Sequence, residues 1–342
     1  RRRLPPPDAG GPYRGLESRL GAVRPLSPEV RLYLNAEFPR DLCDFQGRGA
    51  DGVGLFRTEF LFLGRRVEDI TREDHRRIYA GLSREVYPAP ANIRTFDLGL
   101  DQLRDPRHGP PEANPALGMR GIRLSLAMQE AFRRQLEGIV LANELGNLRL
   151  ILPFVCSLDE VRQAREMLDR IIDSSGTAVN RLPLGIMLEI PSTFFLVDAL
   201  SREADFFALG TNDLVQYTLA VDRGGLYAPS RFLSAHPAVR QGLELIQARA
   251  AAGGKEVICC GEMASHPLFL LLLLGAGFRS FSVNLQVLPL ISCLTRQVER
   301  DSLRAFYEAL RVLQTFPEIE RLFQQRLGEF FPPELVETLQ SA

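Results

Sequence analysis

Short apolar runs alternate with segments of helical periodicity along most of this chain. The runs that predict strands are residues 30–36, 52–58, 92–98, 148–155, 184–190, 205–210, 256–261 and 280–284. The segments that predict helices are residues 73–85, 118–143, 158–174, 192–203, 237–252 and 267–274. Continuous apolar strands suit a sheet covered on both faces, and regular strand–helix alternation implies parallel pairing. The pattern therefore predicts an α/β fold, a closed (β/α)8 barrel of the TIM type.

The two ends of the chain differ from this alternating region. Residues 297–314 and 317–326 carry apolar residues at helical spacing, which predicts extra C-terminal helices packed outside the barrel. Residues 1–29 begin with a Pro- and Gly-rich stretch typical of a linker, and we expect them to connect to a missing or removed N-terminal region. Residues 30–342 are predicted to form one barrel domain.

Polar groups able to do chemistry follow three of the predicted strands. Glu189 ends one strand, Asn212 and Asp213 stand at the end of the next, and Cys260 ends a third. Parallel barrels build their active sites from such carboxyl-terminal strand ends. An acid after a strand is more often a surface cap, but the paired placement of Glu189 and Asp213 favours a site for Mg²⁺, which usually takes one or two protein carboxylates plus substrate oxygens.

Four arginines could lie around the same two acids. They are Arg57, Arg94, Arg120 and Arg223, in a chain whose 41 basic residues include a single lysine, Lys255. Any one of them suits a solvated surface, but guanidinium groups bind phosphate and carboxylate bidentately. Together with the two acids, the set predicts a pocket for a small polyanion bound through a metal.

Charge, hydrophobic segments and cysteines indicate which partners and which cellular compartment to expect. The formal net charge is -1, which gives no general electrostatic reason to expect nucleic acid or an anionic membrane as partner. The apolar stretch 268–274 is too short to cross a membrane and predicts a buried helix. The absence of a Cys-x-x-Cys pair fits a reducing cytoplasm. Cys43, Cys156, Cys259 and Cys293 are interpreted as small buried hydrophobes, whereas Cys260 could exchange a proton with a bound carbanion or enolate.

Three motifs are long enough to be specific. They are Asp51-Gly-Val-Gly-Leu-Phe-Arg-Thr-Glu-Phe-Leu-Phe, Phe206-Phe-Ala-Leu-Gly-Thr-Asn-Asp-Leu-Val-Gln-Tyr-Thr-Leu-Ala-Val-Asp-Arg-Gly and Cys260-Gly-Glu-Met-Ala. From about residue 30 to its end, the chain resembles the phosphoenolpyruvate-utilising enzymes. It is most similar to the carboxyl-terminal barrel of enzyme I of the bacterial phosphoenolpyruvate:sugar phosphotransferase system.

The resemblance implies a function and a role for each residue of the site. Phosphoenolpyruvate would bind to Arg57, Arg94, Arg120, Asn212 and Arg223, and Mg²⁺ to Glu189 and Asp213. Cys260 would protonate C3 of the enolate after the phosphoryl group leaves for a histidine on a separate domain, and pyruvate would be released. The resemblance also implies a downstream phosphocarrier protein, which could serve sugar transport or nitrogen regulation, and a homodimer.

The chain departs from the family's pattern at several places. None of His75, His108, His236 and His266 has the Thr-Ser-His setting of the accepting histidine, so the resemblance places that histidine outside this chain. The family's Gly, Lys, Asn and Trp are replaced here by Leu100, Gln102, Gly225 and Met119, and Asn284 stands where Ser is usual.

Two alternatives stay open, the first suggested by these departures and the second by shared chemistry. One is a degenerate barrel that senses phosphoenolpyruvate, or only dimerises, in a regulatory phosphorelay protein. The other is the matching domain of a dikinase-type enzyme.

Overall fold

The computed structural model describes residues 30–62, 65–103, 112–175, 180–222, 230 and 232–341. The predicted linker 1–29 and the candidate residues His108, Arg223 and Gly225 therefore lie outside the described residues.

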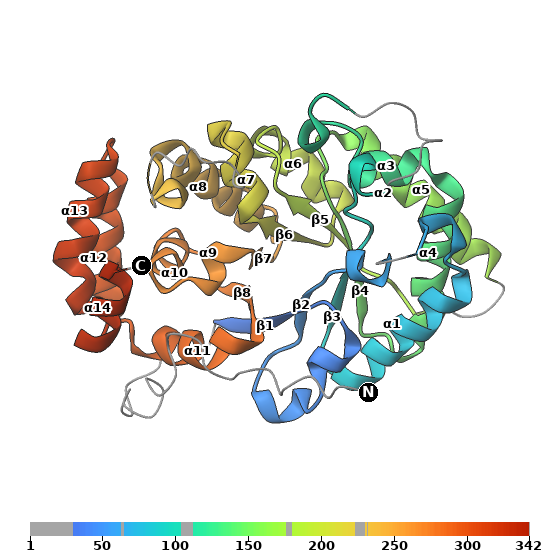
Figure 1. Cartoon of the computed structure of the whole chain (residues 1–342), viewed down its shortest axis with the longest axis horizontal. Coiled ribbons are helices and arrows are strands. Elements are labelled where there is room, and N and C mark those ends of the chain that lie inside the picture. The colour runs from blue at the N-terminus through green and yellow to red at the C-terminus, as the bar shows by residue number, and fades with distance from the viewer. Residues whose placement is uncertain are drawn as a thin grey trace.

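Eight parallel strands close into a barrel in sequence order, from β1 to β8 (Figure 1). They are β1 Arg31–Ala36, β2 Val53–Phe56, β3 Ala91–Arg94, β4 Leu148–Leu152, β5 Leu184–Leu188, β6 Phe206–Gly210, β7 Val257–Cys260 and β8 Ser280–Val283. Pairing of β1 with β8 completes the ring. The predicted barrel is confirmed, although several predicted strands extend past the observed carboxyl ends, where the chain turns away from the sheet.

Alternate strand residues face the barrel interior or the surrounding helices. The interior cluster consists of Tyr33, Leu55, Ile151, Met187, Phe206, Ala208, Ile258 and Cys260. Cys259 belongs instead to the large core between the sheet and the helices. The two adjacent cysteines thus lie on opposite faces of β7, as the two-residue period of a strand predicts.

A polar network closes the amino-terminal end of the barrel. The carboxylate of Glu256 accepts hydrogen bonds from the hydroxyls of Tyr33 at 3.2 Å and Ser280 at 2.9 Å. It also pairs with Arg149 at 3.5 Å, whose guanidinium lies 3.8 Å from the centre of the Phe206 ring. This end of such barrels serves stability, so we expect the chemistry at the other end.

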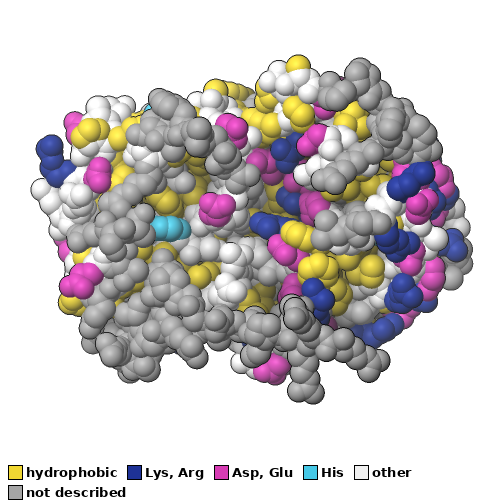
Figure 2. Space-filling model, in the orientation of Figure 1, with side chains coloured by type: hydrophobic (Ala, Val, Ile, Leu, Met, Phe, Trp, Pro, Cys, Tyr) yellow, Lys and Arg dark blue, Asp and Glu magenta, His cyan; other side chains and the backbone are white. Residues whose placement is uncertain are grey.

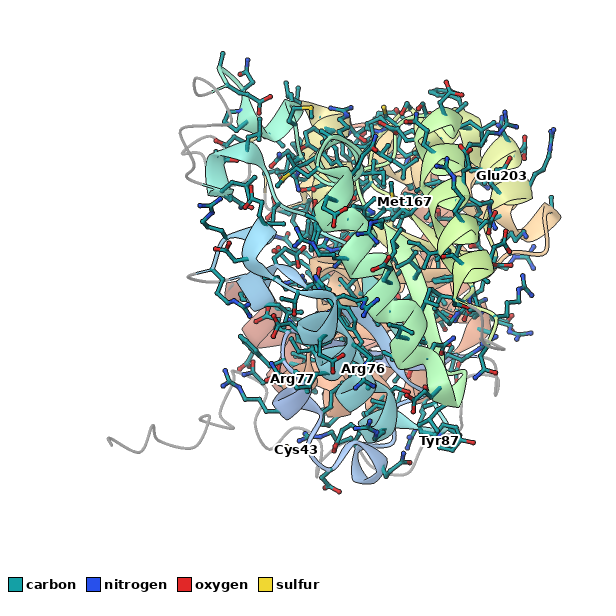
Figure 3. All side chains as sticks on the ribbon, turned by 90° about the vertical axis from the view of Figure 1, so that its right-hand side faces the viewer. Cys43, Arg76, Arg77, Tyr87, Met167 and Glu203 are labelled. Carbon is teal, nitrogen blue, oxygen red and sulfur yellow. The ribbon has the colours of Figure 1, made fainter. Side chains whose placement is uncertain are left out.

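The helices that follow the strands form the outer layer. Five predicted helices are confirmed: α1 Arg72–Val86, α5 Leu158–Ser174, α6 Thr193–Glu203, α8 Pro237–Ala252 and α10 Pro267–Gly275. α1 and α5 begin with reciprocal side-chain caps, Thr71 with Asp74 and Ser157 with Glu160. Figure 3 shows the side on which α1, α4 and α5 cover the barrel, with Arg76 and Arg77 on α1 and Met167 on α5.

The predicted helix 317–326 is also confirmed, as α13 Phe316–Arg326, but the sequence interpretation was wrong about several others. The predicted helix 118–143 is two helices, α3 Ile122–Ala127 and α4 Gln129–Ala142, because Met128 between them has a non-helical ψ of 53°. The predicted helix 297–314 begins later, as α12 Arg300–Arg311, and α11 Leu288–Gln297 precedes it. Besides α11, four helices of the described ranges were not predicted: α2 Leu100–Leu103, α7 Thr211–Leu219, α9 Glu262–Ser265 and α14 Pro333–Ser341.

The last helices form a separate layer at the left of Figure 1, which contains α12, α13 Phe316–Arg326 and α14. The leucines of α10 are buried between the barrel and α12. Arg240 of α8, 1% exposed, donates hydrogen bonds of 2.8 and 3.2 Å to the carbonyls of Arg311 and Leu313 at the end of α12. Cations suit this end of a helix, so Arg240 fixes the added layer to the barrel.

Across the described ranges, no helix is both long enough and apolar enough to span a bilayer.

Candidate active site

A cavity of about 510 Å³ opens at the carboxyl ends of the strands. Seven of the eight predicted site residues line it: Arg57, Arg94, Arg120, Glu189, Asn212, Asp213 and Cys260. The eighth, Arg223, lies outside the described residues. Figure 2 shows acidic and basic side chains side by side near the centre of this face. Residues up to 203 positions apart in the sequence, from Arg57 to Cys260, thus meet in one pocket.

Arg94, the last residue of β3, is held between two carboxylates. Its Nη2 donates to Glu59, and its Nη1 lies 2.9 Å from the Oδ2 of Asp97. The side chain is 12% exposed, and its Nε is buried with no hydrogen-bond partner among the described residues. Burial opposes ionisation of Asp97, but Arg94 and Arg120 outweigh it and lower the pKa of this carboxyl. Arg94 is therefore a charged group in a fixed orientation at the pocket floor.

Arg120 lies in the turn before α3 and joins three elements. Its Nη2 donates to Asp97 at 3.3 Å and to Asp213 at 3.1 Å, and its Nη1 donates to the hydroxyl of Tyr217 at 3.1 Å. A backbone bridge between Gly99 and Arg120 anchors the turn. The planar fork of a guanidinium allows these simultaneous contacts, which a lysine could not make.

Arg57, just past β2, is the most open of the three described arginines in the pocket. Its backbone N–H donates to the carbonyl of Ala36 at 2.9 Å, which continues the pairing with β1. Its side chain is 32% exposed and pairs with Glu37 at 3.4 Å. Ion pairs this exposed contribute little stability, so Arg57 can exchange Glu37 for a bound anion at low cost.

Glu189 follows β5 and is almost entirely buried, at 2% exposure. Its Oε1 accepts a hydrogen bond of 2.6 Å from the backbone N–H of Phe154. A side chain on Gly210 would place its Cβ 2.5 Å from the Oε2 of Glu189, so the glycine makes room for this carboxylate. Burial first, and then the charges of Asp97 and Asp213, raise the pKa of Glu189 well above its usual range.

Asp213, expected at the end of a strand, lies in the first turn of α7. It is 7% exposed and pairs with Arg120. The first turn of a helix is a favourable place for an acidic side chain.

The described lining of the pocket carries an excess of acid. Five carboxylates (Glu59, Asp97, Asp101, Glu189 and Asp213) face three guanidinium groups (Arg57, Arg94 and Arg120). Within the described part of the chain, Glu189 makes no ion pair, and no cluster of three or more His, Cys, Asp and Glu residues could hold a metal alone. The residues therefore fit a hard divalent cation that takes one or two carboxylates here and its remaining oxygens from a ligand and water.

Cys260 ends β7 and faces the pocket at 1% exposure. Its thiol lies 3.5 Å from the carbonyl oxygen of Ile258, to which it donates. Burial raises the pKa of Cys260 to about 12, although the guanidinium groups of Arg57 and Arg94 oppose this shift. The group is therefore a protonated thiol at neutral pH, suited to donate a proton rather than to attack as a thiolate.

Asn212 connects α7 to the turn after β7. Its Oδ1 accepts from the backbone N–H of Glu262 at 2.9 Å, and its Nδ2 donates to the carboxylate of Glu262 at 3.3 Å. The neighbouring Thr211 hydroxyl donates to the carbonyl of Cys260 at 2.9 Å. These bonds fix the amide of Asn212 beside the thiol.

Sequence reasoning missed three residues that organise the site. Glu59 and Asp97 hold Arg94, and both stand in runs already noted for their arginines, Arg57-Thr-Glu and Arg94-Thr-Phe-Asp. Their spacing was a usable signal. Phe154, which binds Glu189 through its backbone, gives no such signal because its contribution is a backbone conformation.

The structure also shows where the histidines and two of the departures from the family pattern, Leu100 and Gln102, lie relative to the pocket. His75 is buried in α1, and His236 and His266 cap α8 and α10, so no histidine of the described ranges lines the pocket. Gln102 does line it, with its Oε1 accepting from the N–H of Gly99 at 3.2 Å. Leu100 packs against the small apolar cluster around Phe96.

The fold and the sequence can be compared with known proteins. A malate synthase of Haloferax volcanii, solved as a lead(II) complex, has a TM-score of 0.51 and 12% identity, covering 78% of this chain and 72% of that one. This likeness supports the barrel fold alone.

Closer relatives are found by sequence. The phosphoenolpyruvate-protein phosphotransferase of Priestia megaterium is 34% identical over 295 residues, which are 85% of this chain and 51% of the relative. The protein of the same name from Cupriavidus necator is 38% identical over 262 residues, 75% of this chain and 45% of the relative. The chain thus spans about half the length of the curated relatives it matches.

The family model described as "PEP-utilising enzyme, PEP-binding domain" matches residues 20–300. This range contains every strand of the barrel and every residue of the pocket. The chain therefore belongs to the phosphoenolpyruvate-utilising enzymes and carries their phosphoenolpyruvate-binding domain.

Proposed function

We propose that this barrel binds phosphoenolpyruvate with Mg²⁺ and is the catalytic domain of a phosphoenolpyruvate-protein phosphotransferase. The observation that carries the proposal is the meeting of three arginines, two buried carboxylates and a protonated thiol in one cavity. Phosphoenolpyruvate brings about two charges on its phosphate and one on its carboxylate at neutral pH. Several cations must converge to bind so compact an anion.

The proposed binding roles follow from charge and position. Arg57, Arg94 and Arg120 bind the phosphate and carboxylate oxygens, with Asn212 as a neutral donor beside them. Arg223 completes this set in the proposal, from the same motif as Asn212. Glu189 and Asp213 are the proposed metal ligands, and Mg²⁺ bound there would neutralise charge on the phosphoryl group as it is transferred.

Cys260 is the proposed acid. Breaking the bond between phosphorus and the enol oxygen sends the phosphoryl group to a histidine nitrogen and leaves the enolate of pyruvate. The enolate takes the thiol proton at C3, which gives pyruvate and a thiolate that regains its proton before the next cycle. A buried thiol whose pKa is about 12 remains protonated until the enolate forms.

The rest of the reaction needs groups beyond the pocket. The accepting histidine is proposed to lie on a separate domain, since the described histidines are buried or cap helices. We also propose a downstream phosphocarrier protein, a cytoplasmic location and a homodimer. The pathway served, sugar uptake or nitrogen regulation, depends on that carrier.

The proposal is tested by mixing this chain with a separately produced phosphohistidine domain of a relative, Mg²⁺ and phosphoenolpyruvate. We expect pyruvate to form and the histidine to be phosphorylated. An intact relative assayed in parallel is the positive control. No pyruvate under conditions in which that control turns over would contradict the proposal.

A second candidate, a barrel that senses phosphoenolpyruvate without turnover, is favoured by Gln102. This neutral side chain lines the pocket where the resemblance led us to expect a lysine. A sensor would bind phosphoenolpyruvate with Mg²⁺ but would not exchange the C3 protons of pyruvate with solvent deuterium. An enzyme would do both.

A further inference from the structure

Phe154 has a backbone conformation that bulky residues rarely adopt. It follows β4 with a φ of 59°, in the left-handed region, and its side chain is 1% exposed. Residues other than glycine persist there only when their surroundings hold them, and such residues cluster at functional sites.

The backbone of Phe154 binds Glu189, one of the proposed metal ligands. Its N–H donates to the Oε1 of Glu189 at 2.6 Å, a short bond to a carboxylate buried at 2% exposure. This bond fixes the orientation of the buried carboxyl group, because breaking it would leave two buried polar groups without a partner. The bond leaves the Oε2 of Glu189 on the side of Gly210.

The ring of Phe154 contacts a different residue of the pocket, Arg120. The guanidinium carbon of Arg120 lies 4.6 Å from the ring centre, and that of Arg123 lies 4.9 Å away. The ring also meets Tyr217 edge-on at 5.7 Å, and the hydroxyl of Tyr217 accepts from Arg120. Arg120 is therefore held by a π face as well as by Asp97 and Asp213.

The turn that contains Gly121 packs tightly against the turn that contains Phe154. Gly121, with a φ of 56°, packs so closely that a Cβ on it would lie 2.4 Å from the Cβ of Phe154. The N–H of Ile122 donates to the carbonyl of Pro153 at 3.2 Å. The turn that carries Arg120 is thus seated on the turn that carries Phe154.

We infer that Phe154 is a positioning residue that couples Glu189 to Arg120, its amide orienting the carboxylate and its ring orienting the guanidinium. Movement at either partner is transmitted to the other through one residue. The ligand roles of these partners rest on the proposed function, whereas the contacts themselves do not.

The amide contact can be tested without ligand. Pro-Phe occurs once in the sequence, at Pro153-Phe154, so labelling proline with carbonyl ¹³C and phenylalanine with ¹⁵N isolates a single amide signal. We expect its proton far downfield in the wild type and shifted upfield in Glu189→Gln. Asp101→Asn, which alters another carboxylate of the pocket, should leave it in place. An unchanged shift in Glu189→Gln would overturn the inference.

The ring contact is tested with a matched pair of variants. Phe154→Leu and Phe206→Leu each remove a buried ring under a guanidinium, one at the pocket and the other at the opposite end of the barrel. Calorimetry with phosphoenolpyruvate and Mg²⁺ should show about tenfold weaker binding for Phe154→Leu and about wild-type binding for Phe206→Leu. If both variants lost the same affinity for phosphoenolpyruvate, the ring of Phe154 would contribute only to packing, and its role in orienting Arg120 would be overturned.

The two tests separate the inference from the proposed function. If the wild type gives no heat with phosphoenolpyruvate and Mg²⁺, the proposed function fails, while the amide shift still decides the coupling of Phe154 to Glu189. Melting followed by circular dichroism verifies that each leucine variant is folded. If Phe154→Leu does not fold, the amide signal of the wild type and Glu189→Gln remains decisive.

Discussion

Arg120 donates a hydrogen bond of 3.1 Å to Asp213, so a turn before α3 and the first turn of α7 are joined inside the pocket. Each side chain is largely buried, at 18% and 9% exposure. In the proposed function one binds the anion and the other the metal, and neither can move without the other.

Replacing Asp213 with Asn should therefore affect both groups. We expect binding of phosphoenolpyruvate in the presence of Mg²⁺ to weaken about a hundredfold, since breaking a buried ion pair costs about 3 kcal/mol or more. Isothermal titration calorimetry measures this change. Asp198→Asn, which removes an exposed carboxylate on α6, should bind as the wild type does. Equal affinities in the two variants would rule out the role of Asp213.

Gly210 should be intolerant of a side chain for a steric reason. In Gly210→Ala the new Cβ would lie 2.5 Å from the Oε2 of Glu189, so the carboxylate must move. We expect binding of phosphoenolpyruvate to lose its dependence on Mg²⁺ and to weaken more than tenfold, about 1.4 kcal/mol. Gly81→Ala is the matched control, because nothing lies within 4 Å of that Cβ and alanine stabilises a helix by about 0.5–1 kcal/mol.

Cys260 and Cys259 allow a direct comparison of neighbours. Cys260→Ala should lower pyruvate formation about 10²- to 10⁴-fold, the usual contribution of a general acid, while phosphoenolpyruvate still binds. Cys259→Ala removes a thiol that faces the helices, so it should lower stability and leave turnover near the wild-type value. Turnover that survives in Cys260→Ala would exclude the thiol as the acid.

His75 should make stability depend on pH in the acid range. Burial lowers its pKa from the ordinary 6.5 to about 4, with the positive charges of Arg134 and Arg65 adding to the effect and Asp74 opposing it. The unfolded chain then binds a proton that the folded chain resists. The contribution of about 3 kcal/mol is complete above pH 6.5 and is lost as the pH falls through about 4.

Urea unfolding at several pH values measures this dependence. The free energy of unfolding of His75→Gln should fall less steeply between pH 6.5 and 4 than that of the wild type. Glutamine still offers a hydrogen-bonding group to the hydroxyl of Tyr79, which lies 3.1 Å from the His75 ring nitrogen. If the free energy of unfolding fell equally steeply with pH in both proteins, His75 would bind a proton as readily in the folded chain as in the unfolded chain.

Much of the barrel and of the site could be predicted from the sequence. The strands are short continuous apolar runs, and their order alone places Glu189, Asp213 and Cys260 at one end of a parallel barrel. Seven predicted site residues do line one cavity. The strand pattern carries this information because parallel strands deliver their carboxyl ends to the same rim.

The remaining features depend on tertiary contacts. The break at Met128 and the left-handed backbone of Phe154 are local backbone conformations, which the periodicity of apolar residues does not reveal. Helix α7 was missed because its first turn carries the polar run Thr211-Asn-Asp, which was interpreted as the end of a strand. The charge balance of the pocket was not predicted, because the acids Glu59 and Asp97, close in sequence to Arg57 and Arg94, were not considered as partners of these arginines.

The central claim is that arginines and a divalent ion at the rim of this barrel bind phosphoenolpyruvate. Calorimetric titration of the chain with phosphoenolpyruvate, with and without Mg²⁺, tests it most directly. The account predicts saturable binding that requires Mg²⁺ and is abolished in Glu189→Gln. Binding that is indifferent to Mg²⁺ and unchanged in Glu189→Gln, or no binding at all, would contradict it.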